Sequence, residues 1–494
     1  MIIHLTPIGD WLVVLPVILG LGGGAALLML RRFLRWQPWL ALLVLLGMVM
    51  CDGVLLERVL TTGPVAMTMG KWLPPFGISF AADGMSALFA LVSGLVAFTV
   101  VLALAIEAPE GAVRDGVYPL VLLLMAGVSG AFLTGDLFNL YVWFEVMLIA
   151  SFGLVALAGN PIQLDAAIKY GVLNIVGTAL FLAALGLLYG QLGTFNMADV
   201  IGVAAKADPL TLTATAAVFC LAFGMKAAVF PVNAWLPASY HAPPAPISAL
   251  MGGVLTKVGV YAFLRLLVVL LPTERELLVP GITAAAVATM VLGPLSAIAE
   301  TNLRRSIGFL LIGGIGVAIS GAVTEGAVFG AVVYVGQSII AFAALYLVAG
   351  LLETATGSFD TRNMGGLYAA SSRLSIMFLV LILGVAGIPP FLGFWPKLLL
   401  LQGYFVDGNW LLVFSLLLNS LIGLIAGARL WSFAFWHPRA EPLVRLRGYA
   451  PAILLTGTVL LLGIAPSLLI KAGSVAARDL LDPGRYIAAV GLAP

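Results

Sequence analysis

Charged side chains are scarce in this sequence. Asp, Glu, Lys and Arg make up 9% of its 494 residues, whereas hydrophobic residues make up 62%. A soluble protein carries about 25% charged residues, and no soluble fold hides this much apolar surface from water. The scarcity therefore excludes a soluble protein. It predicts an all-α, polytopic membrane protein, because each spanning helix needs about 20 apolar residues.

Cysteine and histidine are also rare, with two and three copies. Cys51 and Cys220 lie in or beside apolar stretches without a CxxC pair, which is typical of small core residues. The net charge of +2 is spread without a basic run, and the sequence has no P-loop, nucleophile elbow or dinucleotide fingerprint. We therefore expect no cofactor, no metal site, no nucleic-acid partner and no enzymatic active site.

Long apolar runs are abundant and predict fourteen membrane spans. Residues 195–206 further predict a short interfacial helix, and residues 472–494 a polar tail. The predicted spans are residues 8–30, 38–58, 82–106, 117–134, 137–158, 166–190, 210–235, 246–270, 279–298, 303–322, 327–350, 374–402, 409–433 and 449–471.

The basic residues in the loops predict the orientation of these spans, because cytoplasmic loops carry an excess of Lys and Arg. The strongest cluster is Arg31, Arg32 and Arg35. We therefore expect the loops on this side in the cytoplasm and both termini on the outer side of the inner cell membrane. The other basic residues that agree are Arg304, Arg305, Arg439, Arg445 and Arg447.

Proline interrupts two of the spans in similar ways. One interruption reads "GMKAAVFPVNAWLP" (224–237) and the other "GIPPFLGFWPK" (387–397). Proline removes a helix donor, and inside lipid the freed carbonyls need partners in protein or water. The breaks are five spans apart, and this odd offset implies opposite membrane orientations. The pattern favours inverted repeats with an ion or substrate site at the broken helices; ordinary proline kinks are the alternative.

A few ionisable residues lie deep within the apolar spans. Glu145 is nine residues beyond Asp136, which at ~1.5 Å per residue places it roughly 13 Å deep. Lys257 also falls near mid-depth, and Lys226 and Lys397 adjoin the two breaks. A charge at mid-membrane costs at least ~2.5–3.5 kcal/mol. These groups therefore require pairing or hydration, and both imply a polar path through the interior.

Lysine, rather than arginine, occupies all three deep basic positions. Burial lowers the proton affinity of a lysine and a nearby carboxylate raises it, whereas arginine stays charged. The choice of residue favours proton transfer. The structural alternatives are that Lys226 braces its break, that Lys397 is a helix-end cation, and that Glu145 forms a static pair. Two further residues also have structural alternatives: His241 is a structural loop residue, and Asp83 is a helix cap.

Three stretches carry a resemblance to a known family. They read "TGDLFNLYVWFEVMLIASFGLVAL" (134–157), "FGMKAAVFPVNAWLPASYHAPPAPISALMGGVLTKVGVYAFLR" (223–265) and "AGIPPFLGFWPKLLL" (386–400). The chain resembles the antiporter-like subunits shared by Mrp-type cation/proton antiporters and the membrane arm of respiratory complex I. Within that family it is most similar to the D-type subunits of the Mrp antiporters, and the likeness covers spans three to thirteen.

The resemblance implies fourteen helices, two inverted five-helix repeats and discontinuous helices seven and twelve. The segments implied are a three-helix segment at 1–116, repeats at 117–270 and 271–433, and a C-terminal helix and tail at 434–494. It also implies roles in proton translocation. Glu145 matches the glutamate that modulates a neighbouring lysine, Lys226 that lysine, Lys257 a relay lysine, Lys397 a terminal lysine, and His241 a histidine near proton uptake.

One helix departs from the pattern of the family. A later helix usually carries histidine and lysine as HHxxxK, but here the corresponding stretch is "YVGQSIIAFAALYLVAG" (334–350). Gln337 and Ser338 stand where the histidines are expected, and Phe342 where the lysine is. Gln and Ser still hold water, so they are candidate relay replacements, whereas Phe carries no proton. The route from Lys257 to Lys397 is then water-borne, rerouted or broken.

The resulting hypothesis is a secondary transport subunit rather than an enzyme. It moves protons in a complex with other subunits that exchanges sodium or another monovalent cation. The spans offer no carboxylate cluster for sodium, so we expect the cation to cross in a partner. Two alternatives stay open: a proton-pumping subunit of a redox complex such as complex I or a membrane hydrogenase, and a structural subunit that has lost proton conduction.

Overall fold

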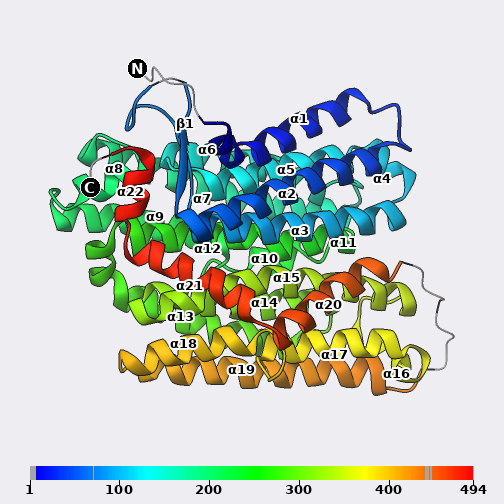
Figure 1. Cartoon of the computed structure of the whole chain (residues 1–494). Coiled ribbons are helices and arrows are strands. Elements are labelled where there is room, and N and C mark those ends of the chain that lie inside the picture. Colours follow the sequence, from blue (N-terminus) through cyan, green and yellow to red (C-terminus); the bar gives the residue numbers. More distant parts are fainter. Residues whose placement is uncertain (1–6, 71, 440–443, 445–447, 493–494) are drawn as a thin grey trace.

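The computed structural model describes residues 7–70, 72–439, 444 and 448–492. The chain forms an all-α bundle of long, roughly parallel helices (Figure 1). Among the described residues, ten helices are long and apolar enough to cross a membrane, or eleven if the bent pair at the C-terminus is one span. Three shorter apolar helices match predicted spans one, four and the first half of twelve. The count of fourteen stays a prediction.

The first half of the chain carries the following elements: η1 (Ile8–Val13), α1 (Leu15–Met29), α2 (Gln37–Thr62), β1 (Val65–Thr68), β2 (Ser79–Ala82), α3 (Gly84–Glu107), α4 (Glu110–Arg114), α5 (Val117–Leu133), α6 (Leu137–Val155), α7 (Pro161–Leu192), α8 (Met197–Ala204), α9 (Pro209–Ala227), α10 (Trp235–Ser239), α11 (Ala245–Leu250), η2 (Met251–Leu255), α12 (Thr256–Leu264) and η3 (Arg265–Leu270).

The second half of the chain carries α13 (Pro272–Ala299), α14 (Leu303–Ile319), η4 (Ser320–Ala322), α15 (Glu325–Thr356), η5 (Thr361–Asn363), α16 (Leu367–Ala370), α17 (Ser372–Ala386), α18 (Phe394–Val406), α19 (Trp410–Trp431), η6 (Ser432–Trp436), α20 (Ala450–Ile464), α21 (Ser467–Leu481) and α22 (Gly484–Val490). Arg445 and Arg447, which entered the orientation argument, lie outside the described residues.

Short polar side chains mark where many helices begin. Each accepts a hydrogen bond from the backbone N–H three residues later, which satisfies a donor that the first helical turn leaves free. In the apolar surroundings of a membrane these caps define the helix ends. The capping residues are Asp83, Asp136, Asn160, Asp208, Asn302, Ser371 and Asn409.

The continuous span from Ala245 to Leu270 and the long helix α15 form the centre of the bundle, and both are almost entirely buried. α15 packs against α3, α14, α18, α20 and α21. It approaches α18 so closely that a Cβ on Gly403 would lie 2.3 Å from Gly326 O, and one on Gly330 would lie 2.6 Å from Leu400 N. The backbones of α15 and α18 therefore touch.

The two ends of the described chain meet at one end of the bundle. β1 and β2 form an antiparallel hairpin with Val65 opposite Ala82. Both η1 and α22 pack against β1 (Figure 1). The predicted short helix near 195–206 is present as α8, and it packs against η3 and α22.

The predicted polar tail at 472–494 is wrong for its described part. α20 and α21 meet at a bend of 78°, and α21 crosses the bundle against α3 and α15 (Figure 1). The buried residues of α21 recur at helical spacing, so this segment is an amphipathic helix despite its polar composition. They are Leu469, Ala472, Gly473, Ala476, Ala477, Asp479 and Leu480.

Candidate functional site

The two helix breaks have the same backbone cap. α9 ends at Ala227, where Val229 N donates to Gly224 O at 2.9 Å, and Ala228 has a φ of 63°. α17 ends at Ala386, where Ile388 N donates to Leu383 O at 3.0 Å, and Gly387 has a φ of 85°. In both, a left-handed residue closes the helix with a bond that spans five residues, as in the Schellman motif. The predicted interruptions are therefore real helix ends.

Lys226 lies in the last turn of α9 and is 6% exposed. Its Nζ donates to Thr178 Oγ1 at 2.8 Å and is 3.5 Å from Asn174 O. The ring of Phe144 lies 5.2 Å from the amine. Both acceptors belong to α7: the Thr178 acceptor is a side-chain hydroxyl, which carries no charge to mark it in an apolar span, and the Asn174 acceptor is a backbone carbonyl, which any residue supplies.

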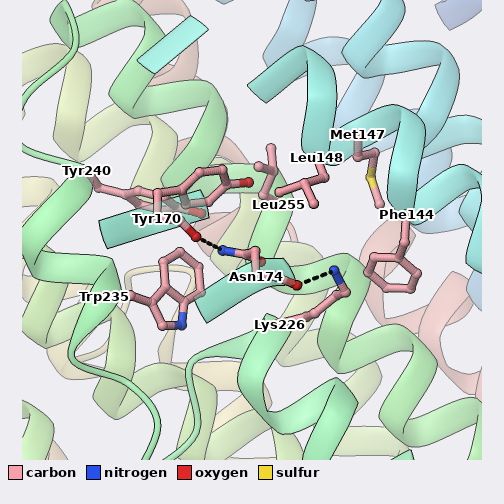
Figure 2. Close-up of a pocket in the computed structure, with 9 residues that line it drawn as sticks. All are labelled: Phe144, Met147, Leu148, Tyr170, Asn174, Lys226, Trp235, Tyr240 and Leu255. Carbon is pink, nitrogen blue, oxygen red and sulfur yellow. Dashed lines mark hydrogen bonds between the residues drawn. The ribbon is translucent and has the colours of Figure 1, made fainter. Parts of the chain in front are cut away.

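A small cavity of ≈ 20 Å³ adjoins the amine of Lys226 (Figure 2). This is enough room for a water molecule, which needs about 10–15 Å³. The cavity reaches the central span that carries Lys257, because Leu255 is part of its lining. The residues that line it are Phe144, Met147, Leu148, Tyr170, Asn174, Lys226, Trp235, Tyr240 and Leu255.

Glu145 lies on α6, next to the Phe144 ring that covers Lys226. Its Oε1 is buried and has no hydrogen-bond partner among the described residues. Glu145 and Lys226 form no ion pair in the described structure, and the amine of Lys226 donates to Thr178 instead. The arrangement is a carboxylate near a lysine that has another hydrogen-bond partner, rather than a closed ion pair.

Lys257 is 2% exposed and lies within the central span. Its Nζ donates to Gly252 O at 2.6 Å, one turn earlier in η2. The ring of Phe342 lies 5.2 Å from the same amine. Phe342, which stands where the family's lysine is expected, therefore faces Lys257 from α15. It gives the amine an aromatic face instead of a titratable neighbour.

Lys397, on α18, is 6% exposed and has the most hydrogen-bond acceptors of the three lysines. Its Nζ donates to Val385 O and Ala386 O at 3.0 Å and to Ser420 Oγ at 2.9 Å. The first two are carbonyls at the C-terminal end of α17, where a cation is favourable. This is the helix-end position that the sequence analysis left open as the structural alternative.

The remaining predicted residues are Gln337, Ser338 and His241. Gln337 and Ser338 are each 2% exposed on α15, and Gln337 Oε1 has no hydrogen-bond partner in the described part of the chain. His241 lies in the loop between α10 and α11, directly after Tyr240 of the cavity. Burial lowers the pKa of His241, and the charges of Arg305 and Arg304 act in the same direction.

No hydrogen bond or ion pair within the described chain joins any two of the predicted translocation residues. The structure brings Lys226 and Glu145 into one region of α6, α7 and α9, places Lys257 against α15, and gives Lys397 separate surroundings. Buried amines at or near broken spans, in a bundle of this kind, define an ion-translocating membrane protein of the secondary-transporter class.

The chain belongs to the family described as NADH:quinone oxidoreductase/Mrp antiporter, TM, which matches residues 134–440. It is 34% identical to the D subunit of the Na(+)/H(+) antiporter of Bacillus subtilis (strain 168), over 97% of this chain and 99% of that protein. The recognised resemblance is thereby confirmed, and the chain is a transport subunit rather than an enzyme.

Solved structures agree with this assignment. A chain of the Mrp complex from Dietzia sp. DQ12-45-1b has a TM-score of 0.90 at 26% identity, covering 98% of this chain and 100% of that one. A chain of the membrane-bound sulfane sulfur reductase, an archaeal respiratory membrane complex, has a TM-score of 0.88 at 26% identity, covering 98% and 99%. The same fold therefore occurs in antiporters and in redox-driven complexes.

Proposed function

We propose that this chain is the D-type subunit of a multisubunit antiporter in the cell membrane, which exchanges a monovalent cation such as sodium for protons. Both chain ends would face outward, as the basic loops predict. Protons would move through Glu145, Lys226, Lys257 and Lys397, with His241 near their uptake. The cation would cross in a partner subunit.

The observation that carries this proposal is the setting of Lys226. Its amine is buried at a helix end, has one short hydrogen bond, and adjoins space for water. An unpaired glutamate oxygen lies on the neighbouring helix. A carboxylate that approaches a buried lysine raises its proton affinity, and one that withdraws lowers it. Thr178 gives the amine a neutral partner as an alternative to Glu145. The lysine can therefore switch between the hydroxyl of Thr178 and the carboxylate of Glu145.

The test is cation-driven proton flux in vesicles that contain the assembled complex with Lys226→Ala. We expect the flux to be lost while the complex still assembles. Lys226→Arg, which keeps the charge but does not release a proton, should also be inactive. Lys169→Ala is the matched control, because Lys169 forms an exposed ion pair with Asp165 on α7. Unchanged flux in Lys226→Ala refutes the assigned role.

The second candidate is a proton-pumping subunit of a redox complex, and the likeness to the sulfane sulfur reductase favours it. The proteins that co-purify with the chain decide between the two. Other antiporter subunits support the first proposal, whereas iron–sulfur subunits support the second. The third possibility, a structural subunit, is supported by Phe342 and predicts that Lys226, Lys257 and Lys397 all tolerate alanine.

A further inference from the structure

A buried cluster of charges closes one end of the central span. Arg265 at the start of η3 is 2% exposed and Asp83 at the start of α3 is fully buried, and Arg265 Nη1 lies 2.6 Å from Asp83 Oδ2. Asp83 Oδ1 also accepts from Ser86 N at 2.9 Å. His241 precedes this span and Arg265 ends it, so the cluster lies at the end opposite His241. Asp83 is the predicted helix cap, but its pairing with Arg265 is new.

A layer of aromatic rings lies beside this pair. Arg265 Nη2 donates to Ser86 Oγ at 3.1 Å and to Tyr261 OH at 3.3 Å, and Tyr261 OH donates to Phe132 O at 2.9 Å. The rings of Phe89, Phe132 and Tyr261 meet edge to face, with centroids 5.1–6.4 Å apart, and all three are fully buried. Such dense packing of fully buried rings disfavours a chain of water molecules.

The C-terminal helices cover the cluster from outside. Asp479 of α21 accepts from Gly84 N at 3.2 Å through Oδ2, and Arg485 Nη1 lies 3.5 Å from its Oδ1. The ring of Tyr486 lies 5.4 Å from the Arg265 guanidinium. A Cβ on Gly84 would lie 2.7 Å from the backbone of Ala476. Three distant parts of the chain therefore close this end together.

The position of the cluster relative to Lys257 gives it a role. Lys257, Tyr261 and Arg265 are four residues apart along one helix face, and eight residues correspond to about 12 Å. A proton on Lys257 could leave along this face if the groups beyond it relayed protons. Arginine does not release its proton, and the carboxylate of Asp83 is held by Arg265 and Ser86 N. Neither group can pass a proton on.

We propose that the Asp83–Arg265 pair and the aromatic layer of Phe89, Phe132 and Tyr261 form a proton seal at this end of the central span. The seal keeps protons that reach Lys257 from escaping across the membrane without exchange. It rests on the proposed function, because a seal matters only where Lys257 lies on a proton path.

The experiment measures passive proton permeability of vesicles that contain the assembled complex, with no cation gradient. Arg265→Gln leaves Asp83 unpaired, and an unpaired buried carboxylate attracts water, so we expect permeability to rise about fivefold or more. The double variant Asp83→Asn/Arg265→Gln removes both charges and should return close to the parent. An Arg265→Gln complex that stays as tight as the parent overturns the proposal.

Arg265→Lys covers the case in which the glutamine variant does not assemble. It keeps the positive charge opposite Asp83 but introduces a group that releases protons, so the seal should leak. A tight Arg265→Lys complex also overturns the proposal.

The matched control is Arg304→Gln. Arg304 and Glu353 form another buried pair at 2.9 Å, 6% and 8% exposed, at the opposite end of the bundle. Breaking that pair should not raise permeability, and an equal rise would show general loosening and refute the seal. A separate measurement tests the proposed function. If Lys226→Ala retains cation/proton exchange, the proposed function is refuted, whatever the passive proton permeability of Arg265→Gln.

Discussion

The two helix breaks share a backbone cap but differ in what satisfies the carbonyls they leave free. At the first break, Trp235 Nε1 donates to Met225 O at 3.0 Å. At the second, Lys397 donates to Val385 O and Ala386 O, while the indole of Trp395 donates across to Gly463 O on α20 at 2.8 Å. An indole closes the first helix end and an ammonium closes the second.

This difference separates the two lysines. Because Trp235 covers the helix end, Lys226 is left with a hydroxyl partner and a neighbouring cavity, and it can exchange that partner for a carboxylate. Lys397 is bound to three acceptors, two of which are carbonyls that the helix end leaves free. The comparison indicates that the donors around a broken helix decide how firmly a buried lysine is bound to the helix end: Lys226 is bound loosely and Lys397 firmly.

Lys397→Ala should have the largest effect on stability. It leaves two buried carbonyls without a donor, and each such loss costs about 1–3 kcal/mol. We expect a clear fall in thermal stability of the purified complex. Lys226→Ala, which frees only a hydroxyl, should shift stability far less. Equal shifts in the two variants, measured by thermal unfolding in the same detergent, would break the comparison.

Thr178→Val should lower exchange strongly while leaving the complex intact. The change removes the neutral partner of Lys226 at almost constant volume, and a buried charged hydrogen bond is worth roughly 1.5–3 kcal/mol. Initial rates of cation-driven proton flux check this, with Thr213→Val as control, because the hydroxyl of Thr213 forms only an exposed bond to Pro209 O on α9. Wild-type rates in Thr178→Val would show that the lysine does not use this partner.

Trp235→Phe should lower exchange by a smaller amount, about fivefold for a loss near 1 kcal/mol. It removes one of the two donors to Met225 O, which also accepts from Ala228 N at 3.3 Å. This carbonyl directly precedes Lys226 in the chain and would then compete with Thr178 for its amine. Trp395→Phe, whose indole bonds α20 instead, is the matched variant and should leave the rate nearly unchanged. Flux measurements on both variants sharpen the comparison. A larger loss in Trp395→Phe than in Trp235→Phe contradicts it.

His241→Gln should have the smallest effect. Burial lowers the pKa of His241 below its ordinary value of about 6.5, so the ring is neutral at pH 7 and above. It binds a proton only as the pH falls below that ordinary value. We expect unchanged exchange at pH 8 and loss of an inflection on the acidic side of the pH–rate profile. A large loss at pH 8 would assign the ring a structural role through its contact with Pro237 O.

The sequence predicted the helical membrane fold, both breaks and the buried lysines, because apolar runs, prolines and isolated charges have strong local signals. It did not predict Thr178 as the partner of Lys226, since a polar residue in a span reveals its partner only when helices pack. It did not predict the pairing of Arg265 with Asp83, because the two residues are far apart in the chain and belong to different predicted spans. The helix α21 was not predicted, because the overall polarity of the segment hides the helical spacing of its apolar residues.

The backbone contact between α15 and α18 has a mechanical consequence. Since not even a methyl group fits between Gly403 and Gly326, α15 and α18 cannot slide independently. They should move together as one rigid unit. Lys397 lies near the start of α18, and Phe342 of α15 contacts Lys257. A movement at the second break would therefore be transmitted to Lys257 through α18 and α15. Gly403→Ala should uncouple the second break from Lys257.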